Sequence, residues 1–256
     1  MMKTAIFIPV RTRSTRLPGK PLLKIKGKTV IEHLIDRVKT AKLLEFIVLC
    51  TTTNPEDEKL VDIAKRNNIK CFRGSEKDIL KRYLDAAMEY NVDFIVNVDG
   101  DDILCDPVYI DRVVERYIKT QADFIRCEGL PFGAASCGIK VEALKKVCEA
   151  KAENNTETGW GAYFTDTKMF NVEAIQAEND LRHPEIRMSL DYPEDYEFFK
   201  EIFNRLYKPG KIFTLREVLM LLKENPKIVD INKNLRKEYR ERFRKMCTKI
   251  KFKKEN

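Results

Sequence analysis

The sequence is poor in the residues that usually build a metal or redox centre. It has two histidines in 256 residues, and none of its seven cysteines belongs to a C-x-x-C pair. Zinc sites usually need such pairs or clustered histidines, so this composition argues against a zinc site. Several cysteines lie within apolar runs, as Cys50 does. We therefore expect buried, unpaired thiols in a reducing compartment.

Long apolar runs are also absent. A helix that crosses a bilayer needs roughly 18 or more consecutive apolar residues, and the sequence has no such stretch. The apolar segment after Met1 and Lys3 is too short for a secretory signal peptide. The sequence thus predicts a soluble, cytoplasmic protein with no membrane span.

An excess of one sign of charge is missing from most of the chain. The net charge is +8, from 48 basic and 40 acidic residues. Residues 232–256 contain eleven Lys or Arg and three Glu, so this tail carries +8 and residues 1–231 sum to zero. A nucleic-acid binder would have to rely on the tail alone, and we expect no nucleic-acid partner.

Short apolar runs alternate with segments of helical periodicity in the first half of the chain. Strands are expected at 4–10, 46–50, 70–72, 94–98 and 124–127. Helices are expected at 29–38, 55–67, 75–90 and 106–117. Four such β–α units predict an α/β fold whose mostly parallel central sheet has helices on both faces.

The second half is less regular. Strands are expected at 135–141 and 187–190, and helices at 142–150, 193–204 and 214–224. Residues 1–231 are predicted to form one domain, and residues 232–256 a basic, helical C-terminal tail. In open parallel sheets ligands bind at the carboxyl ends of the strands, so polar clusters at those ends are the candidate site.

The segment 11–20, directly after the first strand, is a candidate phosphate-binding loop. It holds four cations, three hydroxyls and one glycine. Arginine binds phosphate oxygens bidentately, and lysine adds a compact charge. A solvated basic turn would have the same composition, so composition alone leaves both interpretations open.

The order of residues in this loop is more specific than its composition. The pattern R-x-x-S-x-R-L-P-G-K, from Arg11 to Lys20, closely resembles the nucleotide-binding signature of the cytidylyltransferases. That family includes CMP-KDO synthetase, sialic-acid-type CMP synthetases and spore-coat polysaccharide cytidylyltransferase-like proteins. Segments 51–57 and 72–83 resemble the last subgroup most. The resemblance implies a Rossmann-like nucleotidyltransferase fold for residues 1–231.

The same resemblance assigns roles to individual residues. It implies that four residues hold the triphosphate: Arg11, Ser14, Arg16 and Lys20. Arg16 and Lys20 are expected nearest the reacting phosphorus. Arg73, Gly74 and Ser75 are expected beside the nucleotide base or ribose. Ser75 has an alternative role as the N-cap of the following helix.

Carboxylates follow the fourth strand in the run Asn-Val-Asp-Gly-Asp-Asp at 97–102. Beside a phosphate-binding loop they would repel the substrate, unless Mg²⁺ is held by one or two carboxylates plus phosphate oxygens. An Asp-rich turn is the structural alternative. The resemblance implies Asp101 and Asp191 as the Mg²⁺ ligands and leaves the role of Asp99 open. Glu194 and Asp195 are expected to cap a helix.

These features predict a nucleotidyltransferase that transfers CMP from CTP to a sugar and releases pyrophosphate. The acceptor is expected to be a sugar acid of a surface or glycan polysaccharide. The expected catalytic residues are Arg16, Lys20, Asp101 and Asp191, which would stabilise charge and hold the metal. The identity of the sugar is open, and so is the oligomeric state, including a homodimer.

Two other enzyme classes of the same broad fold remain as alternatives. A sugar-1-phosphate nucleotidyltransferase would use GTP, UTP or TTP, but its phosphate loop is usually glycine-rich, whereas residues 11–14 contain no glycine. A glycosyltransferase would use Asp99-Gly100-Asp101 as a metal-binding D-x-D. It would not need a loop that clamps a triphosphate.

Features outside these motifs have less definite assignments. His33 is expected to be structural, and His183 is a candidate sugar contact. Trp160, the only tryptophan, is either a sugar-stacking ring or a core residue. Apolar residues recur at helical steps in the tail: Leu235, Tyr239, Phe243 and Met246. They predict a docked helix with a solvated end. The alternatives are that the tail binds an anionic surface, such as membrane lipid, or the face of a dimer partner.

Overall fold

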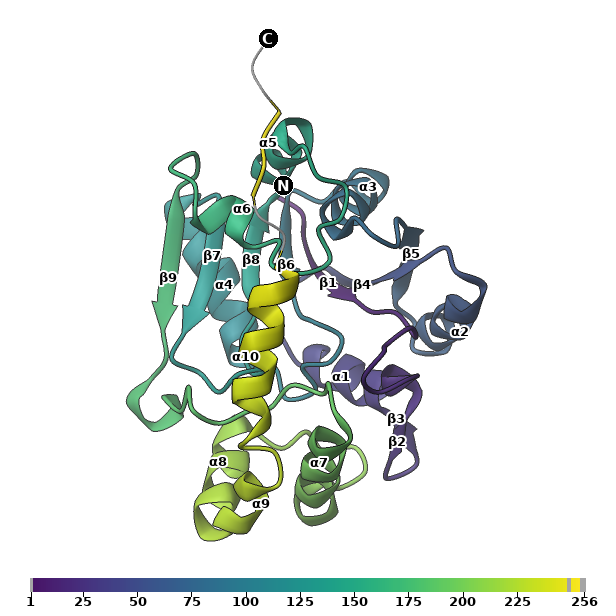
Figure 1. Cartoon of the computed structure of the whole chain (residues 1–256), viewed down its shortest axis with the longest axis vertical. Helices are drawn as coiled ribbons and strands as arrows, with labels where there is room; N and C mark the ends of the chain where they lie inside the picture. The colour runs from purple at the N-terminus through teal and green to yellow at the C-terminus, as the bar shows by residue number, and fades with distance from the viewer. Residues whose placement is uncertain (1, 248–249, 254–256) are drawn as a thin grey trace.

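A seven-stranded sheet forms the centre of the molecule (Figure 1). The computed structural model describes residues 2–247 and 250–253. The strand order is β5-β4-β1-β6-β8-β7-β9. In chain order these strands are β1 (Thr4–Pro9), β4 (Phe46–Thr52), β5 (Lys70–Gly74), β6 (Phe94–Asn97), β7 (Phe124–Glu128), β8 (Cys137–Lys140) and β9 (Val172–Gln176). β8 runs antiparallel to both neighbours, and the other adjacent pairs are parallel.

Helices cover both faces of this sheet. The α-helices are α1 (Val30–Val38), α2 (Glu58–Arg66), α3 (Ile79–Tyr90), α4 (Pro107–Thr120), α5 (Val141–Ala150), α6 (Ala162–Thr165), α7 (Pro193–Leu206), α8 (Leu215–Glu224), α9 (Pro226–Asp230) and α10 (Leu235–Met246). Ile6 and Ile8 of β1 pack into one cluster with α1, α2 and α4. Ala5 and Phe7 point to the other face, against α3 and α5. The predicted α/β class and mostly parallel, doubly covered sheet are confirmed.

Short strands and 3₁₀ turns connect the main elements. The strands β2 (Lys24–Ile25) and β3 (Lys28–Thr29) form a small hairpin before α1. Three 3₁₀ turns are η1 (Lys20–Leu22), η2 (Pro55–Asp57) and η3 (Asn179–Leu181). Capping boxes are present at Thr29 and Thr214. They begin α1 and α8, because each threonine hydroxyl and the glutamate three residues later satisfy the free N–H groups.

The second half of the chain differs from the sequence prediction in two places, one expected strand that is absent and one strand that was not expected. The expected strand at 187–190 is wrong, because this segment makes a single bridge between Phe132 and Arg187. It runs instead between two loops, with Met188 N donating to Phe132 O at 2.6 Å and Leu190 N to Asp101 O at 2.9 Å. Strand β9 was not predicted. It is an edge strand and most of its residues are only half-buried, so its hydrophobic pattern is weak.

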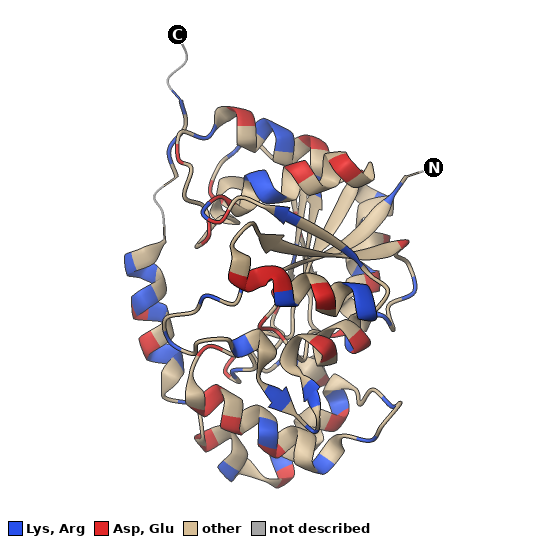
Figure 2. Cartoon of the chain, turned by 90° about the vertical axis from the view of Figure 1, so that its right-hand side faces the viewer, with Lys and Arg blue, Asp and Glu red and all other residues tan. Residues whose placement is uncertain are grey.

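The C-terminal helix α10 lies in front of the sheet in Figure 1, above α8 and α9. Figure 2 shows its dense Lys and Arg residues on the helix beside the grey trace. The predicted tail helix is confirmed, while the domain boundary at residue 231 stays a prediction. Among residues 250–253, Lys251 and Lys253 are exposed, as expected for a solvated end, whereas Ile250 and Phe252 are half-buried. Phe252 bridges to Lys151, and its ring lies 5.8 Å from that of Tyr163.

Within the described residues, no helix combines the length and apolar character needed to cross a bilayer. All seven cysteines are free, and Cys50 and Cys105 are buried while the others are half-buried. Burial raises the pKa of the Cys127 thiol to about 12. Buried thiols with raised pKa values are poor nucleophiles, as expected for structural cysteines.

Candidate active site

The three predicted polar clusters converge at one point beside the sheet. Lys20 Nζ lies 2.5 Å from Asp101 Oδ2 and 3.0 Å from Asp191 Oδ1. Arg16 donates a hydrogen bond to the same oxygen of Asp191. One ammonium group therefore bridges two carboxylates that lie 81 and 171 residues away in the chain. Four of the predicted site residues thus form one cluster.

A buried carboxylate holds the basic loop in shape. Asp57 Oδ1 accepts hydrogen bonds from Thr12 N at 2.8 Å and Thr12 Oγ1 at 2.7 Å, and its other oxygen accepts from Thr52. Asp57 is 1% exposed. The loop closes where Gly19, with φ of 66°, donates from its N–H to Thr12 O at 3.1 Å. A positive φ favours glycine. The loop is therefore fixed near its start by the hydrogen bonds of Thr12 to Asp57 and near its end by Gly19.

The acidic turn after β6 approaches the backbone of β1 closely. A Cβ atom added to Gly100 would lie 2.7 Å from Pro9 O and 2.7 Å from Val10 Cβ. Only glycine fits there without displacement of the backbone. This close approach places Asp101, the next residue, beside the loop that contains Lys20.

Asp191 is fixed by a buried arginine that the sequence analysis did not single out. Arg187 is 2% exposed. It donates to Asp191 Oδ2 at 3.0 Å and to both oxygens of Asp195 at 2.8 Å. Asp195 also accepts from the N–H groups of Asp191 and Tyr192, at 2.9 and 3.0 Å, and so begins α7. The prediction that Asp195 caps this helix is confirmed.

The electrostatics of the cluster reflect an excess of carboxylates. Burial, followed by the neighbouring Asp101, raises the pKa of Asp99 to about 6. Burial and the same neighbour raise the pKa of Asp102 well above its ordinary value. Burial would also raise the pKa of Asp191, but Lys20 and then its arginine neighbours outweigh that effect and lower it. The turn thus holds more acidic groups than the adjacent cations neutralise.

This carboxylate excess fits a divalent cation. The described residues contain no group of three or more His, Cys, Asp or Glu side chains arranged to hold a metal. Mg²⁺, however, is commonly held by one or two carboxylates together with substrate phosphates. Asp101 and Asp191 already face the same cationic group, the Lys20 ammonium. Their oxygens are therefore suitable to hold Mg²⁺ when Lys20 moves away.

Arg11 and Ser14 lie in the same loop but outside the carboxylate cluster. Arg11 donates to Glu76 O at 3.1 Å and lies 3.5 Å from the carboxylate of Glu157. Its side chain is 37% exposed, so it is accessible to a ligand. Ser14 Oγ accepts from Leu17 N at 3.3 Å and so supports the turn. Their expected contact with a triphosphate stays a prediction.

The predicted base or ribose residues lie at the end of β5. Arg73 donates to Thr52 O at 3.0 Å and to Asn54 O at 2.8 Å, so its guanidinium already binds the end of β4. A Cβ added to Gly74 would lie 2.7 Å from the Phe72 ring. These contacts are structural, and the expected role of Arg73 and Gly74 in nucleotide binding stays a prediction.

Ser75 is not the N-cap of α3. The cap is Asp78, whose carboxylate accepts from Lys81 N at 3.1 Å. Ser75 Oγ accepts from Asp78 N at 3.1 Å, one turn earlier. The helix therefore starts at Ile79 and not at 75. Arg11, through Glu76 O, joins this segment to the basic loop.

The two histidines lie away from the cluster. His33 is buried, with Nε2 2.7 Å from Ile25 O, and its ring packs 4.5 Å from that of Phe203. The prediction of a structural His33 is confirmed. His183 is half-buried, and its Nδ1 lies 2.9 Å from Glu185 Oε1. Its expected contact with a sugar stays a prediction.

Trp160 belongs to an aromatic cluster. Its ring centre lies 5.9 Å from that of Tyr83, 6.3 Å from Phe124 and 6.4 Å from Phe164, each at a steep angle. Such edge-to-face contacts are typical of core packing. Of its two predicted roles, the structure supports the core residue.

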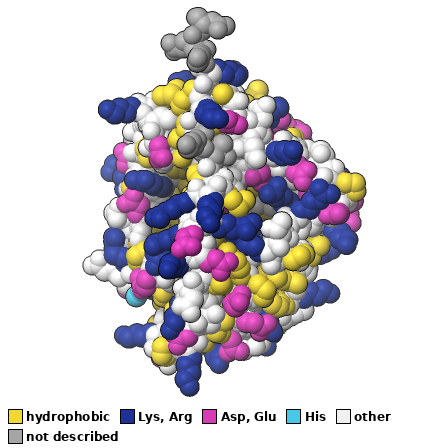
Figure 3. Space-filling model, in the orientation of Figure 1, with side chains coloured by type: hydrophobic (Ala, Val, Ile, Leu, Met, Phe, Trp, Pro, Cys, Tyr) yellow, Lys and Arg dark blue, Asp and Glu magenta, His cyan; other side chains and the backbone are white. Residues whose placement is uncertain are grey.

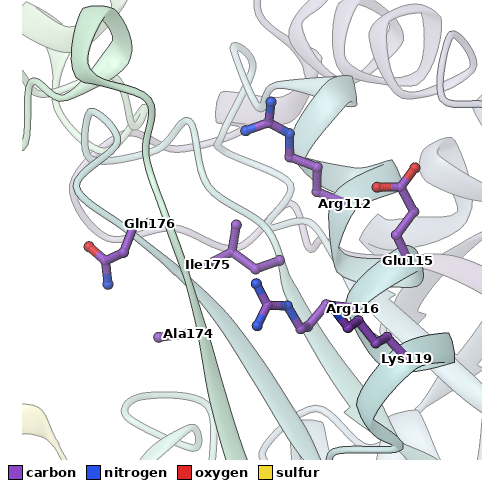
Figure 4. Close-up of a pocket in the computed structure, with 7 residues that line it drawn as sticks. All are labelled: Arg112, Glu115, Arg116, Lys119, Ala174, Ile175 and Gln176. Carbon is purple, nitrogen blue, oxygen red and sulfur yellow. The ribbon is translucent and has the colours of Figure 1, made fainter.

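A cavity also lies elsewhere, between α4 and β9. It has a volume of about 530 Å³ and includes Arg112, Arg116 and Lys119 from α4 (Figure 4). Arg116 pairs with Glu173 at 3.2 Å, and Arg112 pairs with Glu178. These two arginines therefore already have acidic partners. None of the predicted site residues lines the cavity, so the cavity is separate from the candidate active site.

Phosphoryl-type transfer depends mostly on holding charged groups in place, which a basic loop facing paired carboxylates can do for a nucleotide. On a mostly parallel α/β sheet, this is the arrangement of a nucleotidyltransferase, and the chain is an enzyme of that class. Similarity to known proteins narrows the class. A family model described as Cytidylyltransferase matches residues 5–241, so the chain belongs to the cytidylyltransferase family.

Individual relatives agree with this family. An uncharacterized protein of Methanocaldococcus jannaschii is 32% identical over 244 residues, which cover 94% of this chain and 99% of the relative. The spore coat polysaccharide biosynthesis protein SpsF of Bacillus subtilis is 24% identical over 226 residues, covering 86% and 94%. A cytidylyltransferase structure from Leptospira borgpetersenii has a TM-score of 0.82 at 29% identity, covering 90% and 97%. The resemblance inferred from the sequence is confirmed.

Proposed function

We propose that the protein transfers CMP from CTP to a hydroxyl of a sugar acid, releases pyrophosphate and requires Mg²⁺. The observation that carries this proposal is the Lys20 ammonium between Asp101 and Asp191, at the end of the basic loop. Cations and carboxylates that meet at one point suit a triphosphate and its metal together. The family membership of the chain supports the same class of chemistry.

In the proposed reaction, the sugar oxygen forms a bond to the α-phosphorus of CTP. The bond from that phosphorus to its bridging oxygen breaks, pyrophosphate leaves, and the hydroxyl proton passes to water. Mg²⁺ bound to Asp101 and Asp191 would lower the pKa of the attacking hydroxyl and neutralise phosphate charge. Arg16 and Lys20 would exchange their carboxylate partners for phosphate oxygens and stabilise the charge that develops on the leaving group.

Two further residues support this reaction without touching the substrate. Arg187 keeps Asp191 ionised and fixed in orientation when Arg16 and Lys20 turn to the phosphates, because it binds the other carboxylate oxygen. Asp57 holds the loop backbone in the shape that presents its cations. Both are positioning residues.

The choice of CTP and of a sugar acid follows from the signature of the basic loop, Arg11 to Lys20, and its resemblance to CMP-sugar synthetases. A cytoplasmic location is a further expectation of this proposal, from the absence of a long apolar run in the sequence. The proposal leaves the oligomeric state open, including a homodimer.

A pyrophosphate-release assay tests the proposal. CTP, ATP, GTP and UTP would each be combined with a panel of sugar acids and sugar phosphates, with and without Mg²⁺. Pyrophosphate release is expected only with CTP, Mg²⁺ and a sugar acid. Release with UTP or GTP and a sugar phosphate would instead support a sugar-1-phosphate nucleotidyltransferase. Release of a nucleoside diphosphate from a nucleotide sugar would support a glycosyltransferase.

A further inference from the structure

Helix α10 lies directly against the arginines of the active site. The ring of Tyr239 has its centre 5.9 Å from the Arg16 guanidinium and 4.9 Å from that of Arg187. Both arginines bind Asp191. In Figure 3 basic side chains gather in the middle of the face where Figure 1 places α10. The tail is therefore next to the groups that the proposed reaction uses.

Tyr239 and Tyr192 each contact both guanidinium groups, and Phe132 also contacts that of Arg187. Tyr192, which precedes α7, has its ring centre 5.0 Å from Arg16 and 5.7 Å from Arg187. The Tyr239 ring also packs 5.0 Å from Phe132. A guanidinium near an aromatic face is attracted to it, and the attraction strengthens where water is excluded. Two tyrosines from different parts of the chain thus define where Arg16 lies.

A second contact links α10 to the basic loop. Arg242 donates to Thr15 Oγ1 at 3.3 Å. Thr15 immediately precedes Arg16, so the helix contacts the loop at two successive residues. Arg244, two positions further along α10, is exposed. The helix therefore offers one arginine that contacts the loop and a similar one that is directed to solvent.

Residues at both ends of the helix also fix its place. None of the twelve residues of α10, all of which the structure describes, is buried. Before it, the buried Asn232 donates to Arg187 O at 3.2 Å and to Asp195 Oδ1 at 2.9 Å. After it, Cys247 lies against Gly159, where an added Cβ would be 2.1 Å from Cys247 Sγ. The helix adds no buried residue to the core, and its half-buried Tyr239 and Arg242 face the site.

The proposed reaction gives the contact of α10 with Arg16 a role. Arg16 binds Asp191 in this structure and must bind phosphate when the nucleotide and metal arrive. While it changes partners, a long side chain would gain rotamer freedom that binding must then remove. A ring that contacts the guanidinium in both states limits that freedom.

We propose that α10 is part of the active site, in which Tyr239 positions the Arg16 guanidinium for the triphosphate and Arg242 steadies the loop at Thr15. This inference rests on the proposed function. It assigns the basic tail to nucleotide binding through one ring and one arginine, and leaves its other charges in solvent.

Binding of Mg²⁺–CTP to the full chain, measured by calorimetry, tests the inference with matched variants. Tyr239→Phe keeps the aromatic face, whereas Tyr239→Leu keeps apolar bulk against Phe132 but removes the face. Tyr239→Leu is expected to raise the dissociation constant about fivefold to tenfold, and Tyr239→Phe by less than about twofold. Arg242→Ala is expected to raise it about threefold, and Arg244→Ala by less than about twofold.

Thermal unfolding without nucleotide separates positioning from folding. A merely structural role would lower the melting temperature of Tyr239→Leu while leaving the dissociation constant of the folded protein unchanged, and that result would overturn the inference. Equal losses in the Leu and Phe variants would also overturn it, because the aromatic face would then be irrelevant. If the wild-type chain binds none of the four nucleotides, both the inference and the proposed function fail.

Discussion

The basic loop at 11–20 and helix α10 both contain clustered cations and contact each other, but they are built differently. The loop is fixed by the buried carboxylate of Asp57 and by the φ of 66° at Gly19. Helix α10 has six Lys or Arg among twelve residues, and none of these twelve described residues is buried. The loop, unlike most of α10, directs a cation at fixed carboxylates, because Lys20 contacts Asp101 and Asp191. The comparison teaches that the groups facing a cluster of cations, more than the number of cations, indicate its chemical role.

The largest effect expected from this comparison is at Asp101. Asp101→Asn should lower turnover by at least about a hundredfold, the usual scale for loss of a charge contact in the transition state. The fold should survive, because the substitution reduces repulsion with Asp99 and Asp102. Steady-state pyrophosphate release measures the loss. The control is Glu194→Gln, an exposed carboxylate beside Asp191, which should leave turnover unchanged. Near-normal activity in Asp101→Asn would remove this residue from the site.

The second effect concerns the support of the loop. Asp57→Asn should lower the free energy of unfolding by about 2 kcal/mol, because it replaces a buried carboxylate that accepts three hydrogen bonds. The exposed Asp62→Asn on α2 is the matched control and should change stability little. Urea unfolding measures both. An equal, small change in the two variants would mean that the loop does not depend on Asp57.

The effect of Asp57 should also depend on pH. Burial alone would raise the pKa of Asp57, but hydrogen bonds from Thr52 and Thr12 outweigh burial and lower it. A carboxyl with a lowered folded-state pKa stabilises the fold above its unfolded-state pKa, and this contribution disappears as pH falls through the folded-state value. The stability difference between wild type and Asp57→Asn should therefore shrink in acid.

The third prediction concerns the nucleotide. At about ten times its dissociation constant, CTP should stabilise the protein by about 1.4 kcal/mol, or a few degrees in melting temperature. ATP, GTP and UTP at the same concentration should give smaller shifts. Arg244→Ala, on the tail, should retain the shift with CTP. A larger shift with GTP or UTP would favour a sugar-1-phosphate nucleotidyltransferase.

The smallest effect should come from the end of the tail. Deletion of residues 249–256 should change the Michaelis constant for CTP by less than about threefold, which is below roughly 1 kcal/mol. The deletion removes the contact of Phe252 with Tyr163 but leaves Asn232 and Tyr239 in place. A tenfold increase that shrinks at high salt would show that the final cations attract the nucleotide over a distance.

The sequence predicted the first half of the fold better than the second. Buried parallel strands such as β1 and β4 appear as continuous apolar runs, and the basic loop follows β1 directly. Strand β9 lies at the edge of the sheet, and its apolar and polar residues alternate only weakly. Its sequence pattern therefore resembles that of a loop. A local pattern also does not reveal that segment 187–190 pairs with loops rather than with the sheet.

The candidate site was predicted from motifs, but its supporting residues were not. Lys20, Asp101 and Asp191 lie in recognisable segments, and the structure brings them together. Arg187 was missed because a buried arginine is rare and its segment was expected to be a strand. Its spacing of four residues to Asp191 and eight to Asp195 is the signal that could have identified it. Tyr239 was read only as part of an apolar stripe.

The position of Lys20 between two carboxylates has a consequence for the order of events at the site. A metal ion that arrives alone competes with an ammonium group for Asp101 and Asp191. A nucleotide that arrives alone must draw Lys20 away and leave those carboxylates uncompensated. Each ligand therefore removes the obstacle to the other. If the protein binds CTP and Mg²⁺ as proposed, thermodynamic reciprocity requires that CTP raise the affinity for Mg²⁺ by the same factor by which Mg²⁺ raises the affinity for CTP.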